Sequence, residues 1–357
     1  MDKETATVID GVRAAFANQV DYCRANGAPI TTRVVEGVAA ALDGDNAFAR
    51  RLREWPERPL ADGLPLRCAG GMHALMLAGA EPGLAPLYRG EAEAMGDAEH
   101  LVGDAIDRHA DALLPWLDGP PQTNEAGRSS NYIAAMLWLA DRGLPPRFDC
   151  LEIGSSAGVN LMIDRYHYAL GGVAVGPGDS GMQLSPEWRG SPPPGLPSDW
   201  GFARLKGCDV APVDLRDPAQ LLRLKAYVWP EHHQRFQRLE FAAASALLKP
   251  PELVKQDADA FVEAELARAQ APGTTRIVMH SIVWQYLGAE RQARITRAIE
   301  AAGAAATAAR PLAWVALESN RDSFKHELNV RMWPGDGQPD LLARAHAHGA
   351  WIEWLAG

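Results

Sequence analysis

The stretch Phe148-Asp149-Cys150-Leu151-Glu152-Ile153-Gly154-Ser155-Ser156-Ala157-Gly158-Val159-Asn160 determines how the rest of the chain is interpreted. Its first half is apolar enough for a short strand buried on both faces, and no side chain from Gly154 to Gly158 is larger than serine. Such a turn lets a ligand approach the backbone, and the N–H groups of the helix expected after it favour a polar or anionic group. Glu152 is an acid within the apolar strand, so it needs a partner such as a hydroxyl or an ammonium group.

Strands alternate with helices after this turn. Apolar runs predict further strands at 203–208, 253–256, 276–279, 312–317, 327–332 and 350–354. This alternation predicts a parallel sheet with right-handed crossovers. The segment 169–200 is rich in Gly, Pro and Ser and interrupts the alternation, so we interpret it as an inserted loop or hairpin.

The chain before Phe148 shows helical periodicity and no strand pattern. Helices are expected to about residue 26, at 31–42, 47–55, 66–77 and 98–117, and from Asn124 to Arg142. The run Asp118-Gly119-Pro120-Pro121 is the best candidate for a boundary. We therefore expect a helical domain over 1–118 and an α/β domain over 119–357.

The turn motif carries a family resemblance. Glu152, Gly154 and Gly158 follow a strand as in the first motif of the Rossmann-like, class I S-adenosylmethionine (SAM) methyltransferases, usually written E/D-x-G-x-G-x-G, and Ser156 replaces the middle glycine. A longer pattern also resembles a bacterial family of unknown function, through QTNE at 122–125, LEIGSSAGVNL at 151–161, DRY at 164–166 and CDVAP at 208–212. The methyltransferase resemblance implies a seven-stranded sheet with an antiparallel last strand, and SAM as the cofactor.

Polar or small residues follow each of the first five expected strands. Ligands of open α/β sheets bind at such carboxyl ends, although a strand end is also polar simply because it faces solvent. The resemblance implies that Asp209, ending the second strand, holds the ribose hydroxyls and that Asp257, after the third, accepts a bond from the adenine amine. The cofactor contacts that we expect are therefore Glu152, Gly154, Ser155, Ser156, Gly158, Asn160, Asp209, Asp257 and Ser281.

Candidates for handling the methyl acceptor lie on two segments. His280 ends the fourth strand, and a histidine side chain is the usual proton acceptor near neutral pH, so it is the candidate general base, unless it is bonded within the core. Asn124, Arg128 and Asn131 precede the first strand. Asn124 could simply cap a helix, and Arg128 could form a surface ion pair. Alternatively, Arg128 binds an acceptor carboxylate, and the acceptor site lies between the helical domain and the sheet.

Composition narrows the classes of partner. With 45 acidic and 35 basic residues, the net charge of −10 argues against nucleic acid as the main partner and leaves a small-molecule acceptor. The expected compartment is the cytoplasm, since no stretch is apolar and long enough to span a membrane and the first residues lack a signal-peptide core. The Cys and His residues lack metal-ligand spacing, so no metal is expected.

Three other functions fit parts of the pattern. The domain could bind SAM or a related nucleoside without catalysis. It could be an NAD-binding oxidoreductase with Asp209 on the ribose, although the G-x-G-x-x-G pattern is absent. It could be a hydrolase using Ser155 or Ser156 with His280, although the G-x-S-x-G spacing is absent as well.

Overall fold

The computed structural model describes residues 3–56, 58–320, 323 and 325–356. The chain forms two compact units, each built from two segments. The helical unit comprises Met1–Thr123 with Asp217–Gln237, and the sheet unit comprises Asn124–Arg216 with Arg238–Gly357. The sequence predicted a division after residue 118 and an unbroken second domain. In the structure the division follows Thr123, and the segment 217–237 belongs to the helical unit.

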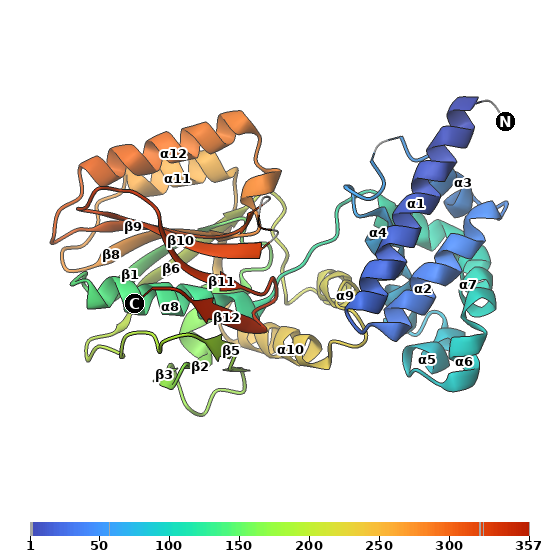
Figure 1. Cartoon of the computed structure of the whole chain (residues 1–357), viewed down its shortest axis with the longest axis horizontal. Coiled ribbons are helices and arrows are strands. Elements are labelled where there is room, and N and C mark those ends of the chain that lie inside the picture. Colours follow the sequence, from blue (N-terminus) through green and yellow to red (C-terminus); the bar gives the residue numbers. More distant parts are fainter. Residues whose placement is uncertain (1–2, 57, 321–322, 324, 357) are drawn as a thin grey trace. The chain divides into compact units, whose positions relative to one another are not determined.

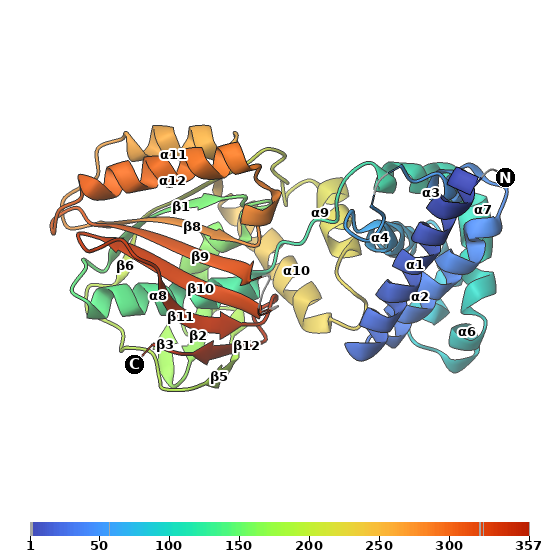
Figure 2. The same ribbon diagram turned by 45° about the horizontal axis from the view of Figure 1, so that its top comes forward.

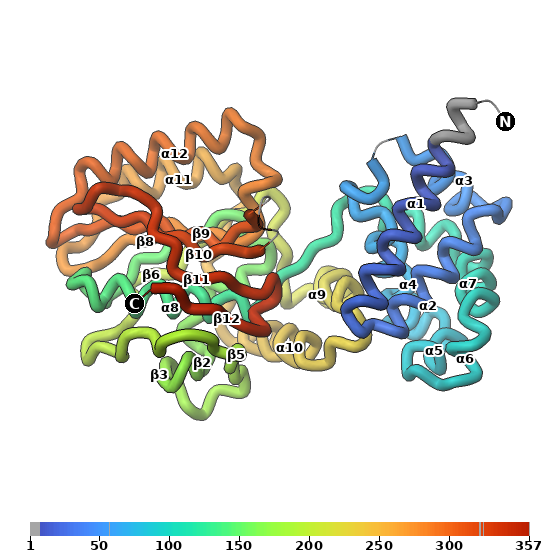
Figure 3. Tube along the Cα trace, viewed as in Figure 1, coloured from blue at the N-terminus to red at the C-terminus, as the bar shows by residue number. Residues whose placement is uncertain are grey.

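The helical unit contains the helices predicted before residue 118, two short helices that the periodicity did not predict, and one helix from the segment 217–237. Its α-helices are α1 (Lys3–Ala25), α2 (Pro29–Ala40), α3 (Ala47–Arg53), α4 (Leu64–Leu77), α5 (Ala85–Tyr88), α6 (Ala92–Gly96), α7 (Ala98–Leu113) and α9 (Pro218–Ala226). Short 3-10 turns lie at Ala41–Asp43, Pro82–Leu84 and Leu114–Leu117. Apolar side chains from α1, α2, α4 and α7 form one core, including Phe16, Val35, Met72 and Val102. Figure 3 shows the course of these four helices along the Cα trace.

Specific bonds attach the segment 217–237 to the helical unit. The α2 N-terminus has no side-chain cap of its own at Ala28. Glu231 supplies one, because its carboxylate accepts the Thr31 N–H at 2.9 Å and the Thr31 hydroxyl at 2.8 Å. Gly70 on α4 leaves room for the ring of Tyr227, since a Cβ at Gly70 would lie 2.6 Å from that ring.

The sheet unit is built on one large mixed sheet (Figure 1). Its nine strands lie in the order β5-β12-β11-β10-β9-β8-β1-β6-β7. They are β1 (Arg147–Ile153), β5 (Glu187–Arg189), β6 (Gly201–Asp209), β7 (Glu252–Lys255), β8 (Thr275–Ser281), β9 (Leu312–Asn320), β10 (Lys325–Trp333), β11 (Asp340–Ala345) and β12 (Trp351–Trp354). The α/β class is confirmed, but the described sheet has nine strands where the resemblance implied seven.

The strand directions define a switch point. Strands β7, β6, β1, β8 and β9 are parallel, whereas β10, β11 and β12 continue from β9 as an antiparallel meander (Figure 2). The chain leaves β1 for β6 on one side and later returns to β8 on the other. The order therefore reverses between β1 and β8, where open α/β sheets bind their ligands.

Helices cover both faces of this sheet. Helices α11 (Ala258–Leu266) and α12 (Ala289–Ala304) pack on the face that carries Leu151 and Val278. Helix α8 (Ser129–Asp141) covers the opposite face of β9 and β10 (Figure 1). Glu152 is next to Leu151 in β1, so it points to the α8 face.

The inserted segment between β1 and β6 is a hairpin with a third short strand. The strands β2 (His167–Leu170), β3 (Val173–Val175) and β4 (Gln183–Leu184) form a small sheet in the order β3-β2-β4. The segment 169–200, interpreted from the sequence as an inserted loop or hairpin, contains β3, β4 and β5, and β2 begins two residues before it. Helix α10 (His233–Leu248) follows α9 after a break that contains Trp229 and Pro230.

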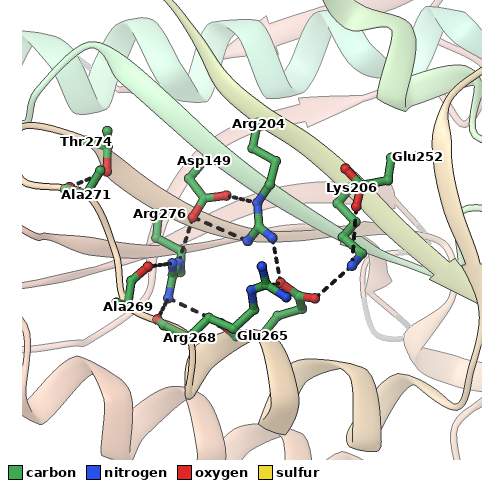
Figure 4. Close-up of polar contacts among 10 residues, drawn as sticks. All are labelled: Asp149, Arg204, Lys206, Glu252, Glu265, Arg268, Ala269, Ala271, Thr274 and Arg276. Carbon is green, nitrogen blue, oxygen red and sulfur yellow. Dashed lines mark hydrogen bonds and ion pairs between the residues drawn. The ribbon is translucent and has the colours of Figure 1, made fainter. Parts of the chain in front are cut away.

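A buried ion-pair network joins β1, β6 and β8 to α11 (Figure 4). Asp149 accepts hydrogen bonds from Arg204 Nε and Arg276 Nε, both at 2.8 Å. Glu265 on α11 binds Arg204 at 2.7 Å and Lys206 at 3.0 Å. Burial raises the pKa of Glu265, but the bonds from Lys206 and Arg204 outweigh it and leave that pKa below its ordinary value. The network lies away from the carboxyl ends of the strands and fixes α11 on the sheet.

Candidate functional site

The turn after β1 is closed by two side chains of the protein itself. Asn124 Oδ1 accepts the N–H groups of Ala157 and Val159, each at 3.2 Å. Asp209 Oδ2 accepts the Ser156 N–H at 2.8 Å, and its Oδ1 accepts the amide of Ala211. Backbone carbonyls accept the other two amides: Cys208 O binds that of Ser155, and Ser155 O binds that of Gly158. The turn therefore offers no free row of N–H donors to an anion.

The glycines of the turn make room for protein side chains. Gly154 has a φ of +67°, and a Cβ there would overlap Val283, whose own Cβ would lie 2.9 Å away. A Cβ at Gly158, with a φ of +71°, would lie 2.9 Å from Pro251 Cγ. The expectation that these glycines leave space for a ligand is therefore corrected, since Val283 and Pro251 occupy that space.

Backbone strain is concentrated at the switch point. Within the described ranges, Ser156 and Ile282 are the non-glycine residues with positive φ, at 53° and 54°. One follows β1 and the other follows β8. Each costs roughly 1–2 kcal/mol relative to ordinary backbone, and such strain is found most often at functional sites. Ser156 holds a left-handed backbone conformation that glycine adopts at little cost.

Unpaired buried acceptors surround Glu152. Glu152 Oε1 accepts Asn160 Nδ2 at 2.8 Å, but Glu152 Oε2 and Asn160 Oδ1 have no partner among the described residues. Burial raises the pKa of Glu152 to about 7, although bonds from Asn160 and Ser155 act in the opposite direction. The 3-10 helix η5 (Val159–Arg165), shorter than the helix that the sequence predicts, places Asn160 here.

Helix α8 contributes polar groups to the same region. Burial raises the pKa of Tyr132 well above its ordinary value, and the nearby charge of Glu152 raises it further. The Tyr132 hydroxyl lies beside Ser281 and makes no well-formed hydrogen bond to any described residue. Arg128, at the start of α8, is close enough to lower the pKa of Glu152. We refer to Arg128, Tyr132, Glu152 and Asn160 as the polar cluster.

The other residues expected to bind an acceptor are buried in the sheet unit. Arg128 is only 7% exposed and donates from Nε to the Ala347 carbonyl at 2.8 Å, so it is not a surface residue. Asn131 is fully buried, and its Nδ2 donates to the Arg128 carbonyl at 3.2 Å. Asn131 Oδ1 and Ser156 Oγ are further buried oxygens without a described partner. Asn124 accepts the backbone N–H groups of the turn after β1, as described above.

His280 is held on the opposite face of the sheet from Glu152. Its Nδ1 lies 2.6 Å from Glu318 Oε1, and its Nε2 accepts the Trp314 indole N–H at 2.9 Å. An indole N–H can only donate, so Nε2 is unprotonated and the proton is on Nδ1. Trp284 stacks on the ring at a centroid distance of 5.1 Å. Both nitrogens are engaged, so His280 has no free nitrogen for the general-base role that the sequence assigned to it.

Asp257 also lies at the carboxyl ends of the parallel strands, but beside β7, the outermost of them. Its carboxylate binds Arg291 at 2.9 Å and remains half exposed.

Tyr132 was not predicted as a site residue, because its spacing with Met136 and Leu139 indicates an apolar helix face. A tyrosine next to the polar run Ser129-Ser130-Asn131 was the available signal.

The described residues contain no group of three or more His, Cys, Asp or Glu side chains that could hold a metal ion. Among the helices of the described ranges, none is long and apolar enough to cross a membrane.

The chain matches one protein family over nearly its whole length. No curated protein and no solved structure matches the chain significantly. The family described as "Uncharacterized protein conserved in bacteria (DUF2332)" matches residues 13–354. The chain therefore belongs to this bacterial family.

Proposed function

We propose that the sheet unit binds SAM at the carboxyl ends of β1 and β6 and catalyses methyl transfer to a small-molecule acceptor. The observation that carries this proposal is the type of polar atom left unpaired. Asn160 Oδ1 and, in the ionised carboxylate, Glu152 Oε2 are both acceptors, whereas every N–H donor of the turn from 155 to 159 is taken. Such a site favours a ligand that supplies donors, such as an ammonium or hydroxyl group, over a phosphate.

The side chains present fit an adenosyl amino-acid cofactor. Glu152 and Asn160 would accept its ammonium group, and burial of the carboxylate would strengthen that contact. Each Asp209 oxygen accepts one backbone N–H and retains a second acceptor position for ribose hydroxyls. Asp257 stays the candidate for the adenine amine. When bound, SAM supplies an electrophilic methyl group on a sulfonium.

The residues of this chain would then position the acceptor and exclude water. Methyl transfer from a sulfonium depends mainly on proximity and alignment. Tyr132 and Ser281 lie together on the Glu152 face of the sheet and would bind the polar end of the acceptor. The positive charge of Arg128 beside them favours an acceptor that carries a carboxylate.

Two alternative functions differ from the proposed one in the ligand bound or in turnover. The strand order β7-β6-β1-β8-β9-β10 follows the order of dinucleotide-binding folds, which favours NAD. NAD, however, needs backbone donors for its pyrophosphate, and here Asn124, Asp209 and two backbone carbonyls already bind those donors. A catalytically silent SAM-binding protein would use the same cluster and differ only in turnover.

Titration calorimetry of the full chain with SAM, S-adenosylhomocysteine and NAD tests the proposal. We expect both adenosyl ligands to bind and NAD to give no measurable heat of binding. Incubation with methyl-labelled SAM and a panel of small carboxylic acids, phenols and amines then separates an enzyme from a silent binder. Binding of NAD without binding of SAM would contradict the proposal.

A further inference from the structure

We propose that His326, on β10, is the catalytic residue that takes the proton from the methyl acceptor. This inference rests on the proposed function, because it assigns the base for that reaction. It follows from a comparison of two histidines in the large sheet. His280 lies on β8, in the parallel part, and His326 lies on β10, in the antiparallel part. The two parts meet at β9.

Strand register places His326 on the same face as the polar cluster. Ser281 lies opposite Leu317, and Leu317 lies opposite Leu328. His326 is two residues before Leu328, so it shares the face of Ser281 and, across β8 and β1, that of Glu152. His280 is adjacent to Ser281 in β8 and therefore faces α11 and α12 instead.

His326 also lies at the edge of the sheet where the candidate site is found. Strand β10 runs antiparallel to β9, so its first residues meet the carboxyl end of β9, with His326 opposite Ser319. The structure assigns no hydrogen bond to either ring nitrogen of His326 within the described ranges. A half-buried imidazole without partners is available for proton transfer, whereas both nitrogens of His280 are engaged.

The charged groups around His326 come from three elements. They are Arg128 at the start of α8, Glu318 on β9 and His346 after β11. Burial lowers the pKa of His326 below its ordinary value, and the charges of Arg128 and His346 lower it further, while Glu318 acts in the opposite direction. His326 is therefore neutral at pH 7 and able to accept a proton. His326 lies opposite Ala345 of β11, and Arg128 donates to the carbonyl of Ala347, two residues further along the chain. Arg128, a member of the polar cluster, therefore lies near His326.

In the proposed step, proton transfer to His326 accompanies the displacement that moves the methyl group from sulfur to the acceptor. The acceptor's O–H or N–H bond breaks as its proton moves to a ring nitrogen of His326. The electron pair of that bond forms the new bond to the methyl carbon. The carbon–sulfur bond breaks, and its electron pair remains on sulfur, so that the sulfonium becomes a neutral thioether. The imidazolium then releases its proton to solvent.

Histidine NMR and calorimetry test this assignment without a known acceptor. The full chain is labelled at histidine Cε1, and His326→Gln identifies the His326 resonance. We expect this resonance to titrate below pH 6.5 and to shift on saturation with S-adenosylhomocysteine. The control is His100, whose side chain is 68% exposed on α7 and whose resonance should not respond to the ligand. Because a base contacts the acceptor and not the cofactor, His326→Gln should bind S-adenosylhomocysteine within threefold of the parent chain.

The outcomes separate the two proposals. If S-adenosylhomocysteine binds but the His326 resonance does not respond, or titrates above pH 6.5, the base assignment is overturned and the cofactor site stands. A loss of affinity greater than tenfold in His326→Gln would instead make His326 a cofactor ligand, which also overturns the assignment. If neither SAM nor S-adenosylhomocysteine binds the parent chain, the proposed function fails, and the role of His326 fails with it.

Discussion

Replacing Asp149 with alanine is expected to lower the free energy of unfolding by about 3–5 kcal/mol. Asp149 is the shared acceptor for Arg204 and Arg276 beneath α11. Arg276 is only 4% exposed, so the substitution leaves a buried guanidinium without its carboxylate. Arg276 also donates to the carbonyl of Glu265, in the last turn of α11, and to that of Arg268, just after the helix, so the loss should reach the packing of that helix.

Urea unfolding of the Asp149→Ala variant provides the measurement, and the same network supplies a control. Arg268 pairs with Glu265 at 3.7 Å, but its side chain is 63% exposed. Exposed pairs of this kind contribute about 0–1 kcal/mol, so Arg268→Ala should unfold close to the parent chain. If both variants lost the same free energy of unfolding, the buried Asp149–Arg276 pair would stabilise the fold no more than an exposed pair does.

Replacing Gly154 with valine is expected to cost about 2–5 kcal/mol of folding free energy, and not merely to block a ligand. A β-branched residue at positive φ costs roughly 1–2 kcal/mol, and overpacking against Val283 adds about 1–3 kcal/mol. Gly143 is the matched control. It also has a positive φ, of +85°, but a Cβ added there would meet no other atom within 4 Å, so Gly143→Val should show only the strain.

Thermal unfolding of the two glycine variants and the parent chain distinguishes these contributions. We expect Gly154→Val to lower the melting temperature several degrees more than Gly143→Val does. If the two variants melt together, the space beside Gly154 is open. The turn would then be free to approach a ligand, as its sequence alone predicts.

Much of the sheet unit was predictable, because its signals are local. Apolar runs between polar ends predict β1, β6, β7, β8 and β9, and small residues after β1 predict a tight turn. Strand β11 was not predicted, because Asp340–Ala345 alternates weakly and carries a charge at Arg344. Strand β5 is short, and its partner among the described strands is β12, which is far along the chain, so no local pattern indicates it.

The detailed roles of the site residues depend on long-range contacts that the sequence does not reveal. Asn124 and Asp209 look like ligands in sequence, yet they close the turn after β1 from 33 and 53 residues away. The hydrogen-bond partners of His280, Trp314 and Glu318, are 34 and 38 residues away in the chain. The alternation of side chains along the strands places the His280 ring on the face of the sheet opposite Glu152. Glu152 itself was predictable, since a carboxylate in an apolar strand always requires a partner.

Proton release on ligand binding tests the central claim most directly. Burial raises the pKa of Glu152 to about 7, so in the free protein at pH 7 the carboxyl is about half protonated. An ammonium group bound at Oε2 favours the ionised form and lowers that pKa, so binding must release about half a proton at pH 7. Calorimetry of S-adenosylhomocysteine binding in buffers of different ionisation enthalpy measures this number. We predict release by the parent chain and none by Glu152→Gln, with weaker binding by that variant. Binding without proton release, or with equal release by both proteins, would contradict a ligand ammonium at Glu152.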